Sequence, residues 1–241
     1  MDLLTKAMQA FALLMEIYNV DAYRACATSA MRDAENGKKL AAEIKRLSGL
    51  KIDIISGKEE SRLIQTAIMD WLPAKHTFLH IDVGGGSTEI SMIRNGRIKQ
   101  FESFNIGTVR MKEGKVKESE IRRMHQWLNG LPLPIDEPVK AVGTGGNIVK
   151  LHQLAGTPTA ETTNLHLLQR THTYIESMSM HDRIYDLKLN PDRAEVIGHA
   201  GSIYLQIMKQ CNIHEIYAPD MGLKDGIVRQ LWKRRFEQIS V

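Results

Sequence analysis

The chain has 241 residues, of which 43% are hydrophobic and 25% charged, a composition typical of a soluble globular protein with one large or two modest domains. The longest apolar run near the start, AMQAFALLM, is too short to span a membrane and lacks a signal-peptide pattern. The net charge of +4 comes from interleaved basic and acidic residues, which mildly favours anionic ligands and gives no support for nucleic-acid binding. A cytoplasmic protein without membrane or nucleic-acid partners is therefore expected.

The first part of the chain alternates helical and strand patterns. Apolar residues at every third or fourth position predict a helix over residues 2–18, and a second helical pattern ends at Gly49. The segments YRACATS and LKIDIIS predict two short strands, and a third helix is predicted over residues 58–71, before Pro73. We place a domain boundary at residues 73–76, which gives a first domain over residues 1–74 and a second over 75–241.

The second part begins with three strand patterns, HTFLHIDV, TEISMIRN and RIKQFESFNI, separated by three glycines and by Asn95-Gly96. This spacing predicts an antiparallel meander. Helices are then predicted over residues 118–128, 147–154, 165–178, 191–211 and 223–236, with the strands VKAVGTG and IHEIYAP between them. Strands that alternate with helices indicate an α/β protein with mixed sheets.

The glycine loop in HIDVGGGSTEISM fits neither the dinucleotide-binding fingerprint nor the P-loop, because strand patterns lie on both sides of it. It is predicted to be a hairpin turn whose backbone N–H groups and hydroxyls bind an anion; these residues are Gly84, Gly85, Gly86, Ser87 and Thr88. Asp82 and Glu89 bracket the loop and are oxygen ligands that suit Mg²⁺ bridging a bound phosphate. The alternative is a plain glycine hairpin with two solvated acids.

Two other motifs allow both a structural and a functional interpretation. In VGTGGNIVKL, Gly143, Gly145 and Gly146 lead from a strand into a helix, so they can present backbone donors to an anion or simply form a tight turn. In ISGKEESRLI, Glu59 and Glu60 lie at a helix start, where acids already stabilise the helix dipole.

Arginines gather in RACATSAMRD, where Arg24 and Arg32 flank a Thr-Ser turn. A guanidinium can bind phosphate through two hydrogen bonds, although an exposed salt bridge is the commoner arrangement.

Six blocks occur in the order RACATSAMRDAENG, ISGKEESRLI, DVGGGSTE, GTGGN, PDRAEVI and MGLKDGI. In order and approximate spacing they resemble the exopolyphosphatase and guanosine pentaphosphate phosphatase (Ppx/GppA) family. The resemblance implies an α/β protein of the actin-like, ribonuclease H-like ATPase fold, with two domains, a cleft and Mg²⁺. It also implies hydrolysis of the terminal phosphate of inorganic polyphosphate or of the 5′-γ-phosphate of guanosine pentaphosphate.

The same resemblance assigns roles to individual residues. Glu60 matches the general base that activates the attacking water, and Asp82 and Glu89 match the acids associated with metal and water. Arg32 and Arg193 match arginines of the family's blocks. The glycine loop matches a phosphate loop, and phosphoryl transfer needs such positioning and charge neutralisation.

Family members carry a strand, a loop of the form Asp-x-Gly-Ser-Asn-Ser and further strands before the first helix, whereas this sequence starts at that helix. We therefore expect an incomplete first domain with strands only near Tyr23 and Ile52. An unpaired sheet edge predicts a homo-oligomer, and the absent loop predicts weakened hydrolysis.

Two other functions remain open: a binding module that senses polyphosphate or a nucleotide alarmone, and a kinase of the same broad fold. Glu60 argues against the kinase, because a residue that activates water would promote hydrolysis of the phosphate donor. Polyphosphate and guanosine pentaphosphate present the same terminal group, so the sequence does not distinguish them.

Overall fold

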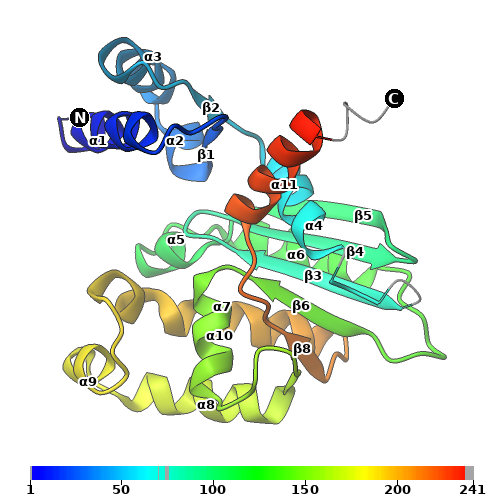
Figure 1. Ribbon diagram of the computed structural model, residues 1–241. Helices are drawn as coiled ribbons and strands as arrows, with labels where there is room; N and C mark the ends of the chain where they lie inside the picture. Colours follow the sequence, from blue (N-terminus) through cyan, green and yellow to red (C-terminus); the bar gives the residue numbers. More distant parts are fainter. Residues whose placement is uncertain (1, 70, 74–75, 237–241) are drawn as a thin grey trace. The chain divides into compact units, whose positions relative to one another are not determined.

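The computed structural model describes residues 2–69, 71–73 and 76–236, and the chain divides into two compact units (Figure 1). Unit 1 runs to Thr66 and also contains the residues from Leu223 onward, and unit 2 comprises Ala67–Gly222. Among the described residues, no helix is both long enough and apolar enough to cross a lipid bilayer.

Unit 1 combines a small parallel sheet with five helices in its described part. The elements are α1 (Asp2–Ile17), β1 (Ala25–Ala27), α2 (Ser29–Asp33), α3 (Gly37–Ser48), β2 (Ile52–Ile54), α4 (Gly57–Ile68, whose last two residues belong to unit 2) and α11 (Leu223–Phe236). β1 pairs with β2 in parallel, with Ala25 opposite Ile52. Gly49 ends α3 in the left-handed conformation, at φ 74°, and its N–H donates to the carbonyl of Lys45. The two strands and the end of α3 therefore confirm the predictions for this part of the sequence.

The last helix, α11, belongs to unit 1 because it packs closely against α4. A Cβ atom added at Gly226 would lie only 1.9 Å from the carbonyl oxygen of Leu63, so only glycine allows this crossing. The predicted boundary falls at residues 73–76, of which 74–75 lie outside the described residues. The proposed domains 1–74 and 75–241 remain a prediction; the compact units divide the chain after Thr66 and return α11 to the N-terminal part.

Unit 2 is built on a six-stranded sheet with the strand order β5-β4-β3-β6-β8-β7. The strands are β3 (Thr77–Val83), β4 (Thr88–Arg94), β5 (Arg97–Phe104), β6 (Lys140–Thr144), β7 (Thr163–Asn164) and β8 (Glu215–Tyr217). β3, β4 and β5 form the predicted antiparallel meander, whereas β3, β6 and β8 are parallel. The predicted α/β class with mixed sheets is confirmed.

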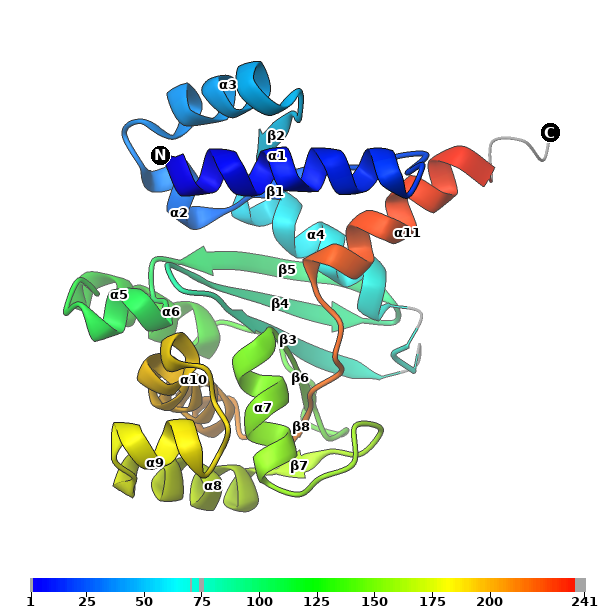
Figure 2. The ribbon, with the colours of Figure 1, turned by 60° about the vertical axis from the view of Figure 1, so that its left-hand side comes forward.

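The helices of unit 2 are α5 (Thr108–Lys112), α6 (Glu118–Asn129), α7 (Gly146–Leu154), α8 (Leu165–Ser177), α9 (Met180–Tyr185) and α10 (Pro191–Gln210). Figure 2 shows α7, α8 and α10 on one side of the sheet. Side chains of α6, α7, α8 and α10 form the main hydrophobic core with the strands.

The two faces of β3 carry different side chains, because successive residues of a strand point to opposite faces. Leu79, Ile81 and Val83 face the main core. Phe78 belongs to a second cluster with the end of α4, and His80 and Asp82 share its face by alternation. The sheet therefore separates an apolar core from a face that carries charge at the end of β3.

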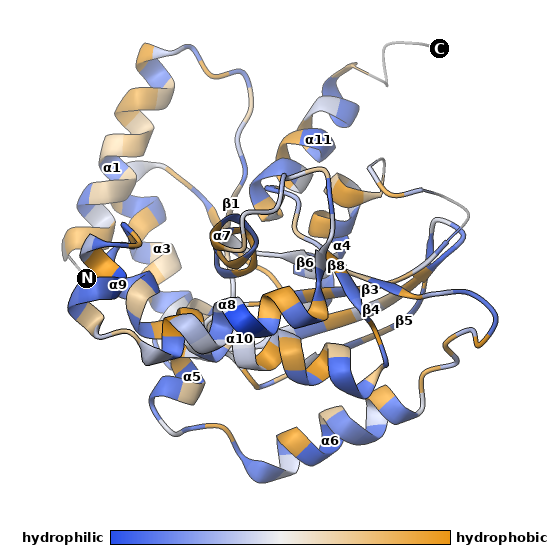
Figure 3. Cartoon of the chain, turned by 90° about the horizontal axis from the view of Figure 1, so that it is seen from below, coloured by the Kyte–Doolittle hydropathy of each residue, from blue (hydrophilic) through white to orange (hydrophobic). Residues whose placement is uncertain are grey.

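Helix α1 exposes several large hydrophobic side chains. Leu3, Leu13 and Ile17 are 84%, 61% and 69% exposed, and Phe11 is also exposed. The hydropathy colouring in Figure 3 shows hydrophobic residues along α1. Clusters of exposed apolar side chains commonly mark surfaces that another molecule or segment covers.

Candidate active site

A row of polar side chains crosses four strands of unit 2 at the end of β3. The strand register places Thr144 opposite Asp82, Asp82 opposite Glu89, and Glu89 opposite Ser103. Directly opposed residues project to the same face of a sheet, with Cβ atoms about 5 Å apart. We call Thr144, Asp82, Glu89 and Ser103 the polar row. The structure thus brings together the two carboxylates that the sequence predicts as metal ligands.

The negative charges of the two carboxylates in the polar row are disfavoured by removal from water. Glu89 is only 2% exposed, and its Oε1 atom accepts a hydrogen bond of 2.7 Å from the Ser103 hydroxyl. Burial, with a smaller contribution from the charge of Glu89, raises the pKa of Asp82 from 3.8 to about 6, while a hydrogen bond with Thr144 acts in the opposite direction. Two carboxylates that are close together and partly removed from water repel each other, so binding of a proton or a cation between them is favourable.

Behind the polar row lies a buried group that the sequence analysis missed. His80 is fully buried, and its Nε2 atom lies 2.9 Å from the hydroxyl of Thr144. Burial lowers the pKa of His80 from 6.5 to about 4, so the imidazole is neutral at physiological pH. The hydroxyl of Tyr204 donates to the carbonyl of Thr144 at 2.8 Å. A histidine two positions before Asp82 in an apolar strand was the available signal, because both must share one face.

The glycine loop forms the predicted hairpin turn between β3 and β4. The N–H of Gly84 donates to the carbonyl of Ser87, and none of the three glycines has a left-handed φ. Within the described part of the chain, no acceptor meets the backbone N–H groups of Gly85, Gly86 and Ser87. Gly85 is exposed, so this loop offers amide donors to an anion from solvent.

The two hydroxyl residues of the loop have different environments. Ser87 is buried, at 5% exposure, next to the open amides. The Thr88 hydroxyl donates to the carbonyl of Ile106 at 2.6 Å. In this geometry the Thr88 hydrogen is already engaged, so Thr88 anchors the loop instead of supplying the donor that the sequence predicts.

The second glycine cluster touches two other predicted site residues. Gly145, at φ 100°, precedes α7, and a Cβ added there would lie 3.3 Å from Oδ1 of Asp82. A Cβ at Gly146 would lie 2.6 Å from Nη2 of Arg193. Gly143 instead faces the core, because its Cβ would contact Ile148 at 2.7 Å. Gly143 therefore serves the packing of the turn, and Gly145 and Gly146 lie beside two predicted site residues; that they present donors to an anion stays a prediction.

Arg193 lies in the first turn of α10, where its N–H is capped by the Asn190 side chain. It lines a pocket of about 440 Å³ together with Lys112 and Asn147. Lys112 also forms an ion pair with Glu195. Unit 2 thus combines the glycine loop, the carboxylate pair and a predicted phosphate-binding arginine around the Gly145–Gly146 turn.

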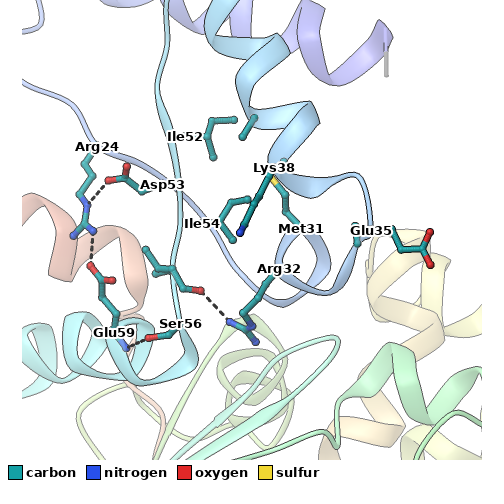
Figure 4. A pocket seen from close by; sticks show the side chains of 13 residues that line it. Arg24, Met31, Arg32, Glu35, Lys38, Ile52, Asp53, Ile54, Ser56 and Glu59 are labelled. Carbon is teal, nitrogen blue, oxygen red and sulfur yellow. Dashed lines mark hydrogen bonds and ion pairs between the residues drawn. The ribbon is translucent and has the colours of Figure 1, made fainter.

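Unit 1 has its own pocket, of about 940 Å³, and Arg24, Arg32 and Glu59 are among the residues that line it (Figure 4). Arg32 donates to the carbonyl of Ile55 at 3.1 Å. Glu60 lies in the first turn of α4, and its N–H donates to the carbonyl of Ser56. Arg32 and the acid pair therefore both adjoin the short segment between β2 and α4.

The charge of Arg24, which lines this pocket, is already neutralised by ion pairs within unit 1. Its guanidinium lies 3.3 Å from Asp53 and 2.5 Å from Glu59, and it also donates to Gln230 of α11 at 2.9 Å. Its side chain is 15% exposed. Arg24 thus links Glu59 of α4 with Asp53 of β2 and Gln230 of α11.

Among the described residues, no group of three or more histidine, cysteine, aspartate or glutamate side chains is arranged to hold a metal. The pair of Asp82 and Glu89 fits Mg²⁺, which commonly binds one or two carboxylates and takes its other ligands from water and phosphate.

Unit 2 thus has a mixed sheet that carries a glycine hairpin between two opposed carboxylates, Asp82 and Glu89. The Ppx/GppA phosphatase family matches residues 1–235, and the chain belongs to this family. Over 97% of the chain and 82% of its counterpart, the fold is similar to the Ppx/GppA protein of Aquifex aeolicus, with a TM-score of 0.75 and 22% identity. The predicted actin-like fold and the family resemblance are confirmed.

Two curated relatives have different names. The chain is 24% identical over 224 residues to exopolyphosphatase 1 of Mycobacterium bovis, covering 85% of this chain and 65% of the relative. It is 23% identical over 239 residues to guanosine-5′-triphosphate,3′-diphosphate pyrophosphatase of Photobacterium profundum, covering 93% of this chain and 48% of the relative. The chain therefore spans between about half and two thirds of the length of these relatives.

Proposed function

We propose that this protein is a phosphohydrolase that removes the terminal phosphate of inorganic polyphosphate or of guanosine pentaphosphate. One observation carries the proposal: Asp82 and Glu89, directly opposed on β3 and β4, lie on either side of a glycine loop that presents three backbone N–H groups. Amides bind phosphate oxygens. The two carboxylates repel a polyanion, so a cation bound between them and the phosphate is needed. The family membership and the names of the relatives support the same reaction.

In this proposal, Asp82 and Glu89 hold Mg²⁺, which when bound supplies positive charge to the oxygens of the phosphate. The amides of the glycine loop orient the phosphate, and Arg32 and Arg193 neutralise charge on it. Glu60 accepts a proton from the attacking water. These roles rest on the family resemblance together with the placement of each residue within its own unit.

A homo-oligomer is also proposed, and the exposed apolar surface of α1 supports it. The cytoplasmic location stays a prediction from the sequence.

The test measures two properties of the purified protein with each substrate. Phosphate release from long-chain polyphosphate and from guanosine pentaphosphate is followed with and without Mg²⁺, and binding is measured by calorimetry. We expect Mg²⁺-dependent release from at least one substrate. Binding without release from either would favour the sensing module, and neither binding nor release would overturn the proposal.

A further inference from the structure

The short helix α5, which has no counterpart among the sequence predictions, begins directly against the glycine loop (Figure 2). Its backbone N–H groups donate to the loop: Thr108 to the carbonyl of Gly84 at 3.0 Å, and Val109 to that of Gly85 at 2.9 Å. The N–H of Arg110 also donates to Gly85, at 3.1 Å. The first N–H groups of a helix need acceptors, and here the loop carbonyls supply them.

The side chain of Arg110 completes this arrangement. Its Nε atom donates to the carbonyl of Gly86 at 2.9 Å. All three glycine carbonyls of the loop therefore accept hydrogen bonds from the segment Thr108–Arg110. Each of these carbonyls points toward α5.

The direction of the carbonyls fixes the direction of the amides. In a trans peptide the C=O and N–H groups of one peptide unit point in opposite directions, and the described chain has no cis peptide. The N–H groups in the same three peptide units belong to Gly85, Gly86 and Ser87. These are the amides without an acceptor among the described residues, and they point away from α5.

Gly107 permits the close approach that this arrangement needs. A Cβ added at Gly107 would lie 2.4 Å from the carbonyl oxygen of Gly85 and 2.5 Å from the carbonyl carbons of Gly85 and Gly86. These obstacles are backbone atoms, so any larger residue must displace the loop itself. Gly107 thus lets the segment approach the loop because it has no side chain, and Thr108, Val109 and Arg110 donate hydrogen bonds to the loop.

We propose that Gly107 and Arg110 are positioning residues that hold the carbonyls of the glycine loop on α5 and thereby aim its amides at the bound phosphate. The inference rests on the proposed function and extends it to residues that touch neither phosphate nor metal. A displacement of about 1 Å at such a loop lowers a rate by about a hundredfold, and one lost hydrogen bond to the loop weakens binding by up to about tenfold.

The experiment measures binding of inorganic tripolyphosphate with Mg²⁺, steady-state phosphate release and the melting temperature for five variants. Gly107→Ala is compared with Gly130→Ala, whose Cβ would make an ordinary contact of 3.5 Å. Arg110→Gln is compared with Arg110→Lys, which keeps one donor, and with Arg122→Gln on the exposed face of α6.

We expect Gly107→Ala to weaken tripolyphosphate binding at least about tenfold and to lower kcat by about a hundredfold. Arg110→Gln should weaken binding about three- to tenfold, Arg110→Lys should recover part of this loss, and both controls should bind like the wild type. If Gly107→Ala does not fold, the Arg110 pair carries the test. If the folded Arg110→Gln and Gly107→Ala variants bind tripolyphosphate as tightly as the wild type does, the inference about positioning is wrong, while the proposed function stands. A wild-type protein that does not bind tripolyphosphate would overturn the proposed function as well.

Discussion

Substituting Asp82 by asparagine should stabilise the protein at neutral pH when no divalent cation is present. The ionised carboxyl of Asp82 is unfavourable in the fold, because burial and the charge of Glu89 raise its pKa from 3.8 to about 6. At about 1.4 kcal/mol per pKa unit, this corresponds to an upper limit of about 3 kcal/mol at pH 7.5. Since Asp82 is only half-buried, we expect about 1–3 kcal/mol, or an increase in Tm of about 3–10 °C.

The pH dependence identifies the cause. A raised carboxyl pKa means that the folded state binds the proton more tightly, so stability is present below pH 3.8 and is lost as the pH rises through about 6. The advantage of Asp82→Asn at pH 7.5 should therefore fall to about half at pH 5. Mg²⁺ should raise the Tm of the wild type more than that of the variant, because the cation stabilises the ionised pair.

Differential scanning calorimetry in EDTA at pH 7.5 and pH 5 measures these effects. Asp136→Asn, at an exposed loop position, is the matched control and should change Tm little. An Asp82→Asn variant that is no more stable than the wild type at pH 7.5, or equally more stable at both pH values, would refute the reasoning.

Three further predictions concern the cation, the unit 1 network and the surface of α1. Excess EDTA should sharply weaken polyphosphate binding, and unchanged affinity would mean that amides and arginines suffice. Arg24→Gln should lower the free energy of unfolding by about 1–3 kcal/mol, because it removes the ion pair with Glu59 and one of the two cations paired with Asp53, the other being Lys51. Arg46→Gln, in an exposed pair, should have a much smaller effect; denaturant unfolding checks this, and equal effects would contradict it. Light scattering should detect concentration-dependent self-association that Phe11→Glu reduces, and a monodisperse monomer at high concentration would contradict it.

The local elements of this fold were readable from sequence because their signals are local. The meander was predicted from alternating residues and Asn95-Gly96, and the end of α3 from Gly49. The return of α11 to unit 1 was not predicted, because it depends on Gly226 meeting Leu63 across more than half of the chain. The sequence predicts each of the two helices, but the pattern within one helix does not indicate which distant helix it packs against.

The sequence also predicted part of the candidate site, namely the residues that lie in or beside a recognisable motif. Asp82 and Glu89 were found because they bracket a glycine loop, and the strand register then placed them side by side. Helix α5 escaped notice because a five-residue helix has almost no periodic signal and is stabilised here by loop carbonyls. His80 escaped notice because a buried histidine in an apolar strand looks like a core residue until its neighbour Thr144 is known.

The most direct test of the central claim is the rate of phosphate release by a folded Glu60→Gln variant. Glu60 lies in the first turn of α4, and glutamine keeps its size while removing the base. In any form of the protein that is active enough to assay, we predict a loss of turnover of at least about a hundredfold in a variant that remains folded. Glu43→Gln, in an ion pair of α3, should keep wild-type turnover. Near-normal phosphate release by the purified Glu60→Gln protein would contradict the proposed hydrolytic role of this residue.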